Sequence, residues 1–227
     1  MKLNDEQTLL RPYCGNDEFR PSMWHPFFDS QLNAVCATDA HNLIIGDKDL
    51  FFNEYATLEK PLGIKNVLPH EENTGIKISY KKLNECFDKI PYSKKHECPE
   101  CGGYGRVDTT YETKTGDKLS IEIECPICGG TGNVIGEERK DERYLVRIKD
   151  LCFRYKSMVV LEKTMENLHI KEARVLALTN SRLFVELLPG LKALFMCFCE
   201  TEDLDGKDER KDSDLVIDYP VDKGGKK

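Results

Sequence analysis

The chain has 227 residues, of which 40% are hydrophobic and 32% charged, and its formal net charge is −7. This balance excludes a disordered chain, and the longest apolar run, Ala193 to Cys199, is too short for a membrane span of roughly 20 residues. The negative charge argues against a wholly basic nucleic-acid binder, although not against a local basic face, and the length allows one large domain or two small ones.

We interpret residues 1–19 as an N-terminal arm. Asp5 and Glu6 stand where a secretory signal peptide would begin its apolar stretch. We therefore expect a cytoplasmic protein in which most thiols stay reduced.

Residues 20–96 show strand patterning followed by one helical stripe. Leu83, Phe87 and Ile90 are spaced i, i+4 and i+7, which predicts an amphipathic helix. The expected elements are strands at 32–38 and 42–45, joined by a turn at 39–41, then an extended segment through 78 and a helix at 80–90.

The most specific motif is Cys-x-x-Cys-x-Gly-x-Gly, which occurs twice and begins at Cys98 and at Cys125. Glycines permit the tight turn that brings two thiolates of one motif together and points backbone N–H groups at the sulfur atoms. Four thiolates complete a tetrahedral site and leave no position for a catalytic water, so we predict one structural Zn²⁺. The predicted ligands are Cys98, Cys101, Cys125 and Cys128.

Between the two motifs, residues 107–113 and 119–124 alternate as strands do around a turn that contains Gly116, which predicts a β-hairpin. We interpret residues 97–139 as an inserted zinc hairpin. Three alternatives remain open at this point. The motifs could be unrelated Gly-rich turns, one of them could be a redox pair, or His96 could replace one thiolate.

Residues 140–199 again show α+β patterning, and neither flank of the zinc hairpin looks complete alone. The expected elements are a helix at 148–167 and strands at 174–178, 183–187 and 191–199. Residues 200–227 contain ten acidic and six basic residues with few apolar ones, so we expect an acidic, disordered tail.

Two resemblances follow from these residues. The paired cysteine motifs resemble half of the cysteine-rich zinc domain of DnaJ-type co-chaperones, but no His-Pro-Asp J-domain loop is present, so a chaperone function does not follow. The segment Val35 to Leu43, VCATDAHNL, resembles the VATDGHRL strand-turn-strand of the bacterial sliding clamp, the beta subunit of DNA polymerase III. Lys-x-Leu helices at 81–83 and 149–151 and the apolar strand 191–196 resemble later parts of that fold, and three positions depart from the first motif: Cys36, Ala40 and Asn42.

The clamp resemblance implies an α+β domain of antiparallel sheets backed by two helices, made by residues 20–96 and 140–199 and interrupted by the zinc hairpin. It also implies that bases on the helices face DNA, although these helices are at most mildly basic. The candidate DNA-binding residues are Lys81, Lys82, Lys89, Lys149, Arg154 and Lys156.

No arrangement of nucleophile, phosphate loop or paired carboxylates stands out, so we expect no enzyme. Asp39 and His41 form an acid–base-looking pair, but a hydrogen-bonded turn is the simpler interpretation. The other cysteines, Cys14, Cys36, Cys86, Cys152, Cys197 and Cys199, are expected to be buried thiols. The sequence thus favours a non-enzymatic binding or scaffold protein, a monomer or small oligomer, that acts on a protein partner or weakly on DNA. An adaptor that grips protein segments with its zinc hairpin is the alternative.

Overall fold

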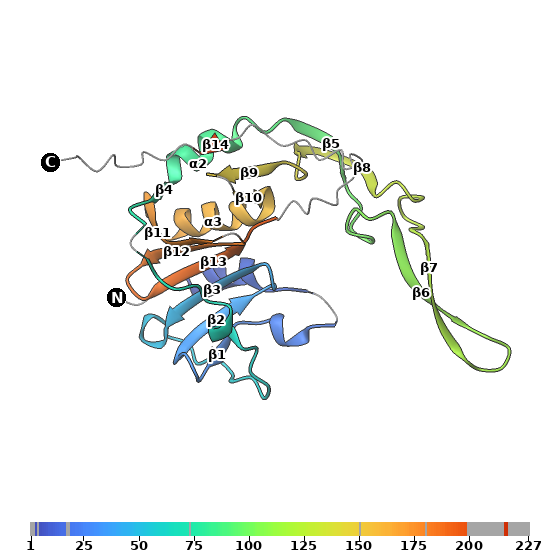
Figure 1. Ribbon diagram of the computed structural model, residues 1–227, viewed down its shortest axis with the longest axis horizontal. Coiled ribbons are helices and arrows are strands. Elements are labelled where there is room, and N and C mark those ends of the chain that lie inside the picture. Colours follow the sequence, from blue (N-terminus) through green and yellow to red (C-terminus); the bar gives the residue numbers. More distant parts are fainter. Residues whose placement is uncertain are drawn as a thin grey trace.

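A seven-stranded antiparallel sheet forms the centre of the body, and a long two-stranded arm projects from the body's side (Figure 1). The computed structural model describes residues 3, 5–16, 19–72, 74–149, 151–179, 181–198 and 216–217. The strands of the central sheet, in spatial order, are β1 (Phe27–Asp29), β2 (Ala34–Thr38), β3 (Asn42–Asp47), β13 (Leu191–Met196), β12 (Arg182–Leu188), β11 (Glu172–Thr179) and β4 (Lys77–Ser79). The two flanks of the zinc hairpin therefore share one sheet, because β3 pairs directly with β13.

Successive residues of the central strands point to opposite faces of the sheet, and both faces are buried. Ile44 and Phe195 belong to the larger core, on the side of the helices. Leu43 and Leu194 belong to a smaller core on the other side, where Ile64 also packs. This alternation explains why the strands read as nearly continuous apolar runs rather than as apolar and polar residues in turn.

Three helices contribute to the larger core. They are α1 (Glu6–Leu10), α2 (Tyr80–Phe87) and α3 (Tyr155–Asn167). α2 buries Leu83 and Phe87, and the ring of Phe87 meets that of Tyr155 edge-on at 5.0 Å between centroids, so α2 and α3 pack side by side. The α+β class with antiparallel sheets is confirmed.

The N-terminal segment differs from the expected separate arm. Leu9, Leu10 and Tyr13 are buried in the larger core, and the hydroxyl of Tyr13 lies 3.0 Å from Oγ1 of Thr164 in α3. The first helix is thus part of the body. Sequence periodicity missed it because five helical residues are too few to show a stripe.

The prediction of one helix over residues 148–167 is wrong for residues 148–154. A hairpin of β9 (Leu145–Ile148) and β10 (Leu151–Arg154) precedes α3, and Lys149 in its turn adopts φ +54°. The apolar residues at 148, 151, 152 and 155 fit a helical stripe and a tight hairpin equally well, so periodicity alone could not separate the two. The predicted helix at 80–90 ends three residues earlier, at Phe87.

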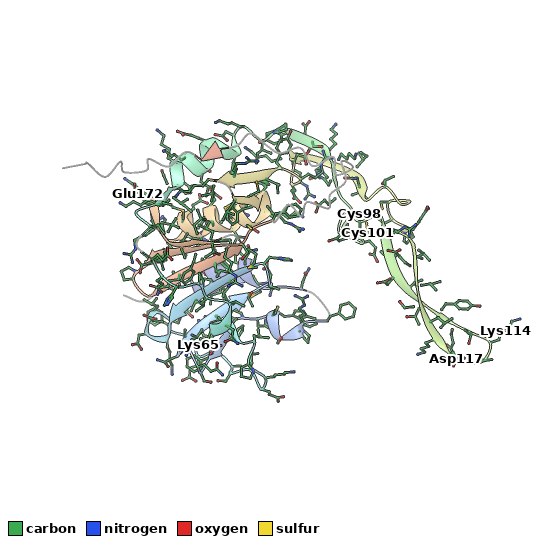
Figure 2. The ribbon with its side chains drawn as sticks, in the orientation of Figure 1. Lys65, Cys98, Cys101, Lys114, Asp117 and Glu172 are labelled. Atoms are coloured by element: carbon green, nitrogen blue, oxygen red, sulfur yellow. The ribbon has the colours of Figure 1, made fainter. Side chains whose placement is uncertain are left out.

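Two ribbons make up the arm. The inner ribbon pairs β5 (Tyr92–Glu97) with β8 (Asn133–Lys140), and the outer ribbon pairs β6 (Arg106–Glu112) with β7 (Lys118–Glu124). The predicted hairpin between the cysteine motifs is therefore confirmed. Figure 2 shows Lys114 and Asp117 at its tip, away from the body, with Cys98 and Cys101 at its root.

From the expected tail, the structure describes only β14 (Val216–Ile217), which pairs in parallel with β9. The predicted disorder of residues 200–227 otherwise lies outside the described residues. Within the described chain, no helix is both long and apolar enough to cross a membrane.

Candidate metal centre and the arm that it supports

The four predicted ligands meet at the root of the arm, where the turn before β6 faces the turn after β7 (Figure 2). Their sulfur atoms all lie within 4.8 Å of one another. Sγ of Cys98 is 3.7 Å from Sγ of Cys125, and Sγ of Cys101 is 3.8 Å from Sγ of Cys128. Four sulfurs about 2.3 Å from a tetrahedral metal ion would stand about 3.8 Å apart. The four cysteines therefore could hold one metal ion.

Each turn directs one backbone N–H at a ligand sulfur. The N–H of Gly105 donates to Sγ of Cys101, and the N–H of Gly132 donates to Sγ of Cys128, both at 3.2 Å. These equivalent bonds give the two turns an approximate two-fold relationship. They stabilise negative charge on sulfur, which is the form that binds a metal.

The two turns also interlock through their backbones. The N–H of Cys98 donates to the carbonyl of Gly132 at 2.9 Å, and the N–H of Cys125 donates to the carbonyl of Gly105 at 2.8 Å. A Cβ at Gly105, where φ is +77°, would lie 2.3 Å from the carbonyl oxygen of Gly130. A Cβ at Gly132 would lie 2.2 Å from the carbonyl oxygen of Gly103, so a side chain at Gly105 or Gly132 would separate the turns and pull the ligand pairs apart.

Two thiols of the cluster differ in how readily they ionise. Burial raises the pKa of the Cys125 thiol to about 11. Burial opposes ionisation of Cys128 as well, but the Gly132 N–H and the neighbouring thiols bring its pKa to about 7. Four thiolates at these distances would repel one another, and a divalent ion bound between them would offset that repulsion and favour the deprotonated form of all four.

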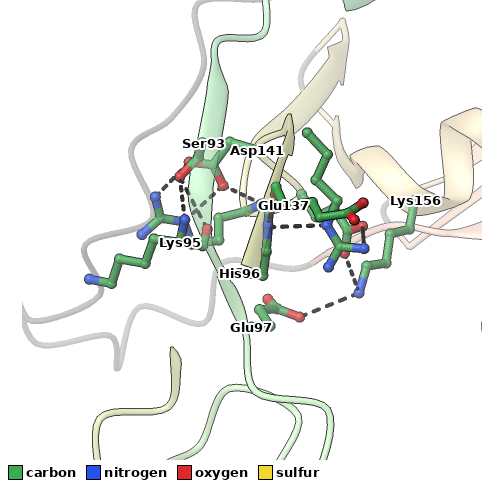
Figure 3. Close-up of polar contacts among 10 residues, drawn as sticks. Ser93, Lys95, His96, Glu97, Glu137, Asp141 and Lys156 are labelled. Atoms are coloured by element: carbon green, nitrogen blue, oxygen red, sulfur yellow. Dashed lines mark hydrogen bonds and ion pairs between the residues drawn. The ribbon is translucent and has the colours of Figure 1, made fainter. Parts of the chain in front are cut away.

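His96 lies beside the centre but does not join it. Its Nε2 donates to the carbonyl of Glu137 at 2.5 Å, and its Nδ1 accepts from Nε of Arg139 at 3.1 Å. Both ring nitrogens are thus engaged across the β5–β8 ribbon (Figure 3). The alternative in which His96 replaces a cysteine ligand is wrong, and its imidazole fixes the inner ribbon instead.

An ion-pair network joins the arm to the body next to this histidine. Nζ of Lys156, in the first turn of α3, lies 2.8 Å from Glu142 and 3.7 Å from Glu97 (Figure 3). Glu97 is the residue before the first ligand, Cys98, and Glu142 also pairs with Arg139 at 3.4 Å. A helix of the body therefore holds the chain at the entry to the metal centre.

One face of the outer hairpin is apolar and exposed. The register pairs Val107 with Ile123, Thr109 with Ile121 and Tyr111 with Leu119, so these six side chains share a face. Val107 packs against the cysteine cluster. Four of the others have large exposed fractions: 54% for Tyr111, 51% for Leu119, 42% for Ile121 and 39% for Ile123. We call residues 107, 109, 111, 119, 121 and 123 the apolar face.

Sequence reasoning found the strands of this face but did not identify the face as a site. The signal was an alternating pattern in two strands that had no predicted third partner. In the described structure no second layer of strands or helices covers this two-stranded ribbon, and such a ribbon is marginally stable by itself.

The six candidate DNA-binding residues come from several elements. Lys81 and Lys82 lie on α2, Lys89 follows its end, Lys149 is in the β9–β10 turn, Arg154 ends β10 and Lys156 lies in the first turn of α3. Among them, Lys81 lies 3.7 Å from Glu85, and Lys156 pairs with the two carboxylates named above. The guanidinium of Arg154 stands 5.4 Å from the ring centroid of Phe198.

Asp39 and His41 form a hydrogen-bonded turn. Oδ1 of Asp39 accepts from the backbone N–H groups of His41 and Asn42 at 2.8 and 2.6 Å, and Oδ2 accepts from the Asn42 amide at 2.8 Å. Ala40 in this turn has φ +76°, a left-handed conformation that favours glycine. The carbonyl of His41 in turn accepts from Met196 N–H, so the turn contacts the end of β13.

Three of the five other cysteines that the structure describes are buried thiols, as expected. Cys36, Cys86 and Cys152 are buried, and Cys14 and Cys197 are half-buried, whereas Cys199 lies outside the described residues. Burial raises the pKa of Cys36 to about 12, so this thiol stays protonated and unreactive near neutral pH.

No family model and no curated protein matches this chain. Among solved structures, the chain is similar to the DNA polymerase III beta subunit of Borrelia burgdorferi, with 11% identity and a TM-score of 0.45 over 86% of this chain and 61% of that one. The beta subunit of Thermotoga maritima has 12% identity and a TM-score of 0.45, over 86% of this chain and 63% of that one. The sliding clamp of Bacillus subtilis has 13% identity and a TM-score of 0.44, over 86% of this chain and 62% of that one. The chain thus spans less than two thirds of the length of these proteins.

Proposed function

We propose that this chain is a non-enzymatic, zinc-containing scaffold that binds another protein through the apolar face of its arm. The single observation that carries the proposal is that face, which exposes Tyr111, Leu119, Ile121 and Ile123 together on a projecting hairpin. Exposed apolar clusters on soluble proteins are typical of interaction sites. The proposed metal is Zn²⁺, because it favours four thiolates in a tetrahedron.

The body serves as the support in this proposal. It resembles a sliding-clamp domain in its motifs, and the two motif segments at 35–43 and 191–196 lie side by side, because Asn42 pairs with Phe195. Lys156 joins the body to the arm at the metal centre. We propose that residues 97–139 are an insertion into this domain, which exists as a monomer or small oligomer and does not encircle DNA.

DNA binding by the body is less well supported. Lys81 and Lys156 neutralise neighbouring acids, so they offer less charge to a phosphate backbone than isolated bases would. DNA affinity that falls steeply with added salt, and falls further in a Lys82→Ala and Lys89→Ala double variant, would favour a clamp-derived DNA-binding role instead.

Selection from a library of random 12-residue peptides tests the proposal. We expect selected peptides to bind the zinc-loaded chain and to lose at least tenfold in affinity for a Leu119→Ser and Ile121→Ser variant. A matched variant on the opposite face, Thr110→Ala with Ser120→Ala, should bind normally. Peptides that bind the double serine variant as well as the wild type, or a selection that yields no binder, would refute the proposal.

A further inference from the structure

The outer hairpin has two chemically different faces. Opposite the apolar face, the register places Asp108 beside Glu122 and Arg106 beside Glu124, with Glu112 and Lys118 toward the tip. Arg106 pairs with Glu122 at 2.8 Å, which neutralises part of this side. The net result is still acidic: the outer ribbon, residues 106–124, holds five acidic and three basic residues, a formal charge of −2.

This charge determines which partners suit the arm. A second copy would bring another outer ribbon of charge −2, and the tail at 200–227 carries a formal charge of −4. Both would place like charges together at close range, which is unfavourable. A partner with lysine or arginine next to its apolar residues would instead complement the arm.

The hairpin also has free strand edges. In the described structure, β6 and β7 pair only with each other, so the outer edge of β7 presents backbone N–H and C=O groups that no other described strand covers. All seven residues of β7 are exposed. An edge of this kind accepts an extended segment as an additional strand, and a third strand stabilises a ribbon that is marginal with two.

We propose that the arm binds an extended protein segment that alternates apolar and basic residues, by strand addition to the edge of β7. This inference rests on the proposed function and specifies its partner. Because side chains of an added strand alternate between the faces, its apolar residues would extend the apolar face beside Leu119, Ile121 and Ile123. Its lysines or arginines would lie on the other face, beside Glu122 and Glu124.

Synthetic nine-residue peptides provide the probe. One alternates valine with lysine, a second alternates valine with glutamate, and a third has the composition of the first in two blocks. Fluorescence anisotropy with the full zinc-loaded chain should show at least tenfold tighter binding of the first peptide than of the other two. Its affinity should fall several-fold between 50 and 300 mM salt. Bound peptide should slow amide hydrogen exchange in residues 118–124.

Charge-reversal variants distinguish this inference from non-specific binding of apolar peptides to the arm. Glu124→Lys should lower the affinity for the lysine peptide at least fivefold and raise the affinity for the glutamate peptide. Glu138→Lys, on exposed β8, should change neither affinity.

If both alternating peptides bind equally well and both lose affinity for the Ile121→Ser variant, the partner assignment fails while the apolar face remains the binding site. If the lysine peptide binds Ile121→Ser as well as wild type, the proposed function fails too. Failure of every alternating peptide to bind a chain that binds library peptides would also overturn the inference.

Discussion

Lys156 in α3 and Glu97 at the end of β5 form an ion pair at 3.7 Å, although 59 positions separate them in the sequence (Figure 3). The same ammonium group lies 2.8 Å from Glu142. Glu97 precedes the first metal ligand, so this contact connects the body directly to the metal centre. A partly exposed polar contact thus links α3 to the entry of the cysteine cluster.

The first prediction concerns this junction. Lys156→Met should leave the free energy of unfolding of the body within about 1 kcal/mol of wild type, because partly exposed ion pairs contribute little. Amide hydrogen exchange in β5 and β8 should become faster, since the arm loses its link to α3. Lys163→Met, exposed on the same helix, is the control. Unchanged exchange in β5 and β8 would show that the arm is held in another way.

A second prediction concerns Glu6, whose buried carboxylate accepts from the Tyr55 hydroxyl at 2.6 Å, from the Asn53 amide at 2.8 Å and from the N–H of Phe52. Burial alone would raise the pKa of this carboxyl, but these hydrogen bonds hold it below its ordinary value. A lowered folded-state pKa means that the ionised form stabilises the fold.

That stabilisation should be complete above the ordinary glutamate pKa of about 4.3 and be lost as the pH falls through the lower folded-state value. Glu6→Gln should therefore cost about 1–2 kcal/mol at pH 7 and progressively less in acid. Urea unfolding of both proteins from pH 7 to pH 3 checks this, with exposed Glu54→Gln as the control. A difference in unfolding free energy between the two proteins that stays constant with pH would contradict the lowered pKa of Glu6.

Ala40 provides the third prediction. An alanine in the left-handed region costs roughly 1–2 kcal/mol, and glycine avoids that cost while losing part of the gain to its more flexible unfolded state. Ala40→Gly should thus raise the free energy of unfolding by about 0.5–1 kcal/mol, whereas Ala37→Gly, inside β2, should lower it. Chemical denaturation measures both. A destabilised Ala40→Gly would mean that the turn is not strained.

The fourth prediction treats the arm as an independent unit. His96 and Val134 are register partners in the β5–β8 ribbon, so deleting residues 97–133 and inserting a short Gly–Ser linker should close the ribbon without strain. We expect the body to keep its near-ultraviolet circular dichroism while it loses the metal. Deleting only residues 108–122 should retain the metal. A molten body in the larger deletion would place the zinc hairpin in the core.

The accuracy of the sequence-based predictions depends on how local the determining contacts are. The meeting of the four cysteines was predictable because each half of the cluster lies within eight residues, and only the contact between the halves is long-range. The hairpin of β6 and β7 was predictable for the same reason. The start of α3 was not, because Ile148 and Leu151 satisfy two periodicities and the turn at Lys149 carries no glycine to mark it.

Long-range packing accounts for the other differences. The N-terminal segment joins the core through Tyr13, whose hydroxyl meets Thr164 at a separation of 151 positions. The sequence left His96 open as an alternative metal ligand. Its ring nitrogens instead bond to Glu137 and Arg139 of the neighbouring strand, which only the folded structure shows. The apolar face is likewise exposed because no third strand pairs with β6 or β7 in the described sheet. The residues of the two strands alone do not show what lies beside them.

The metal content of the purified chain tests the central claim most directly. Elemental analysis should find one zinc per chain in the wild type and none in Cys101→Ser, because three thiolates bind the ion far more weakly than four. Hydrogen exchange should then become fast across residues 97–133 of the variant, while the body keeps its protection. No zinc in the wild type, two ions per chain, or an arm equally protected in Cys101→Ser would contradict a metal-held arm.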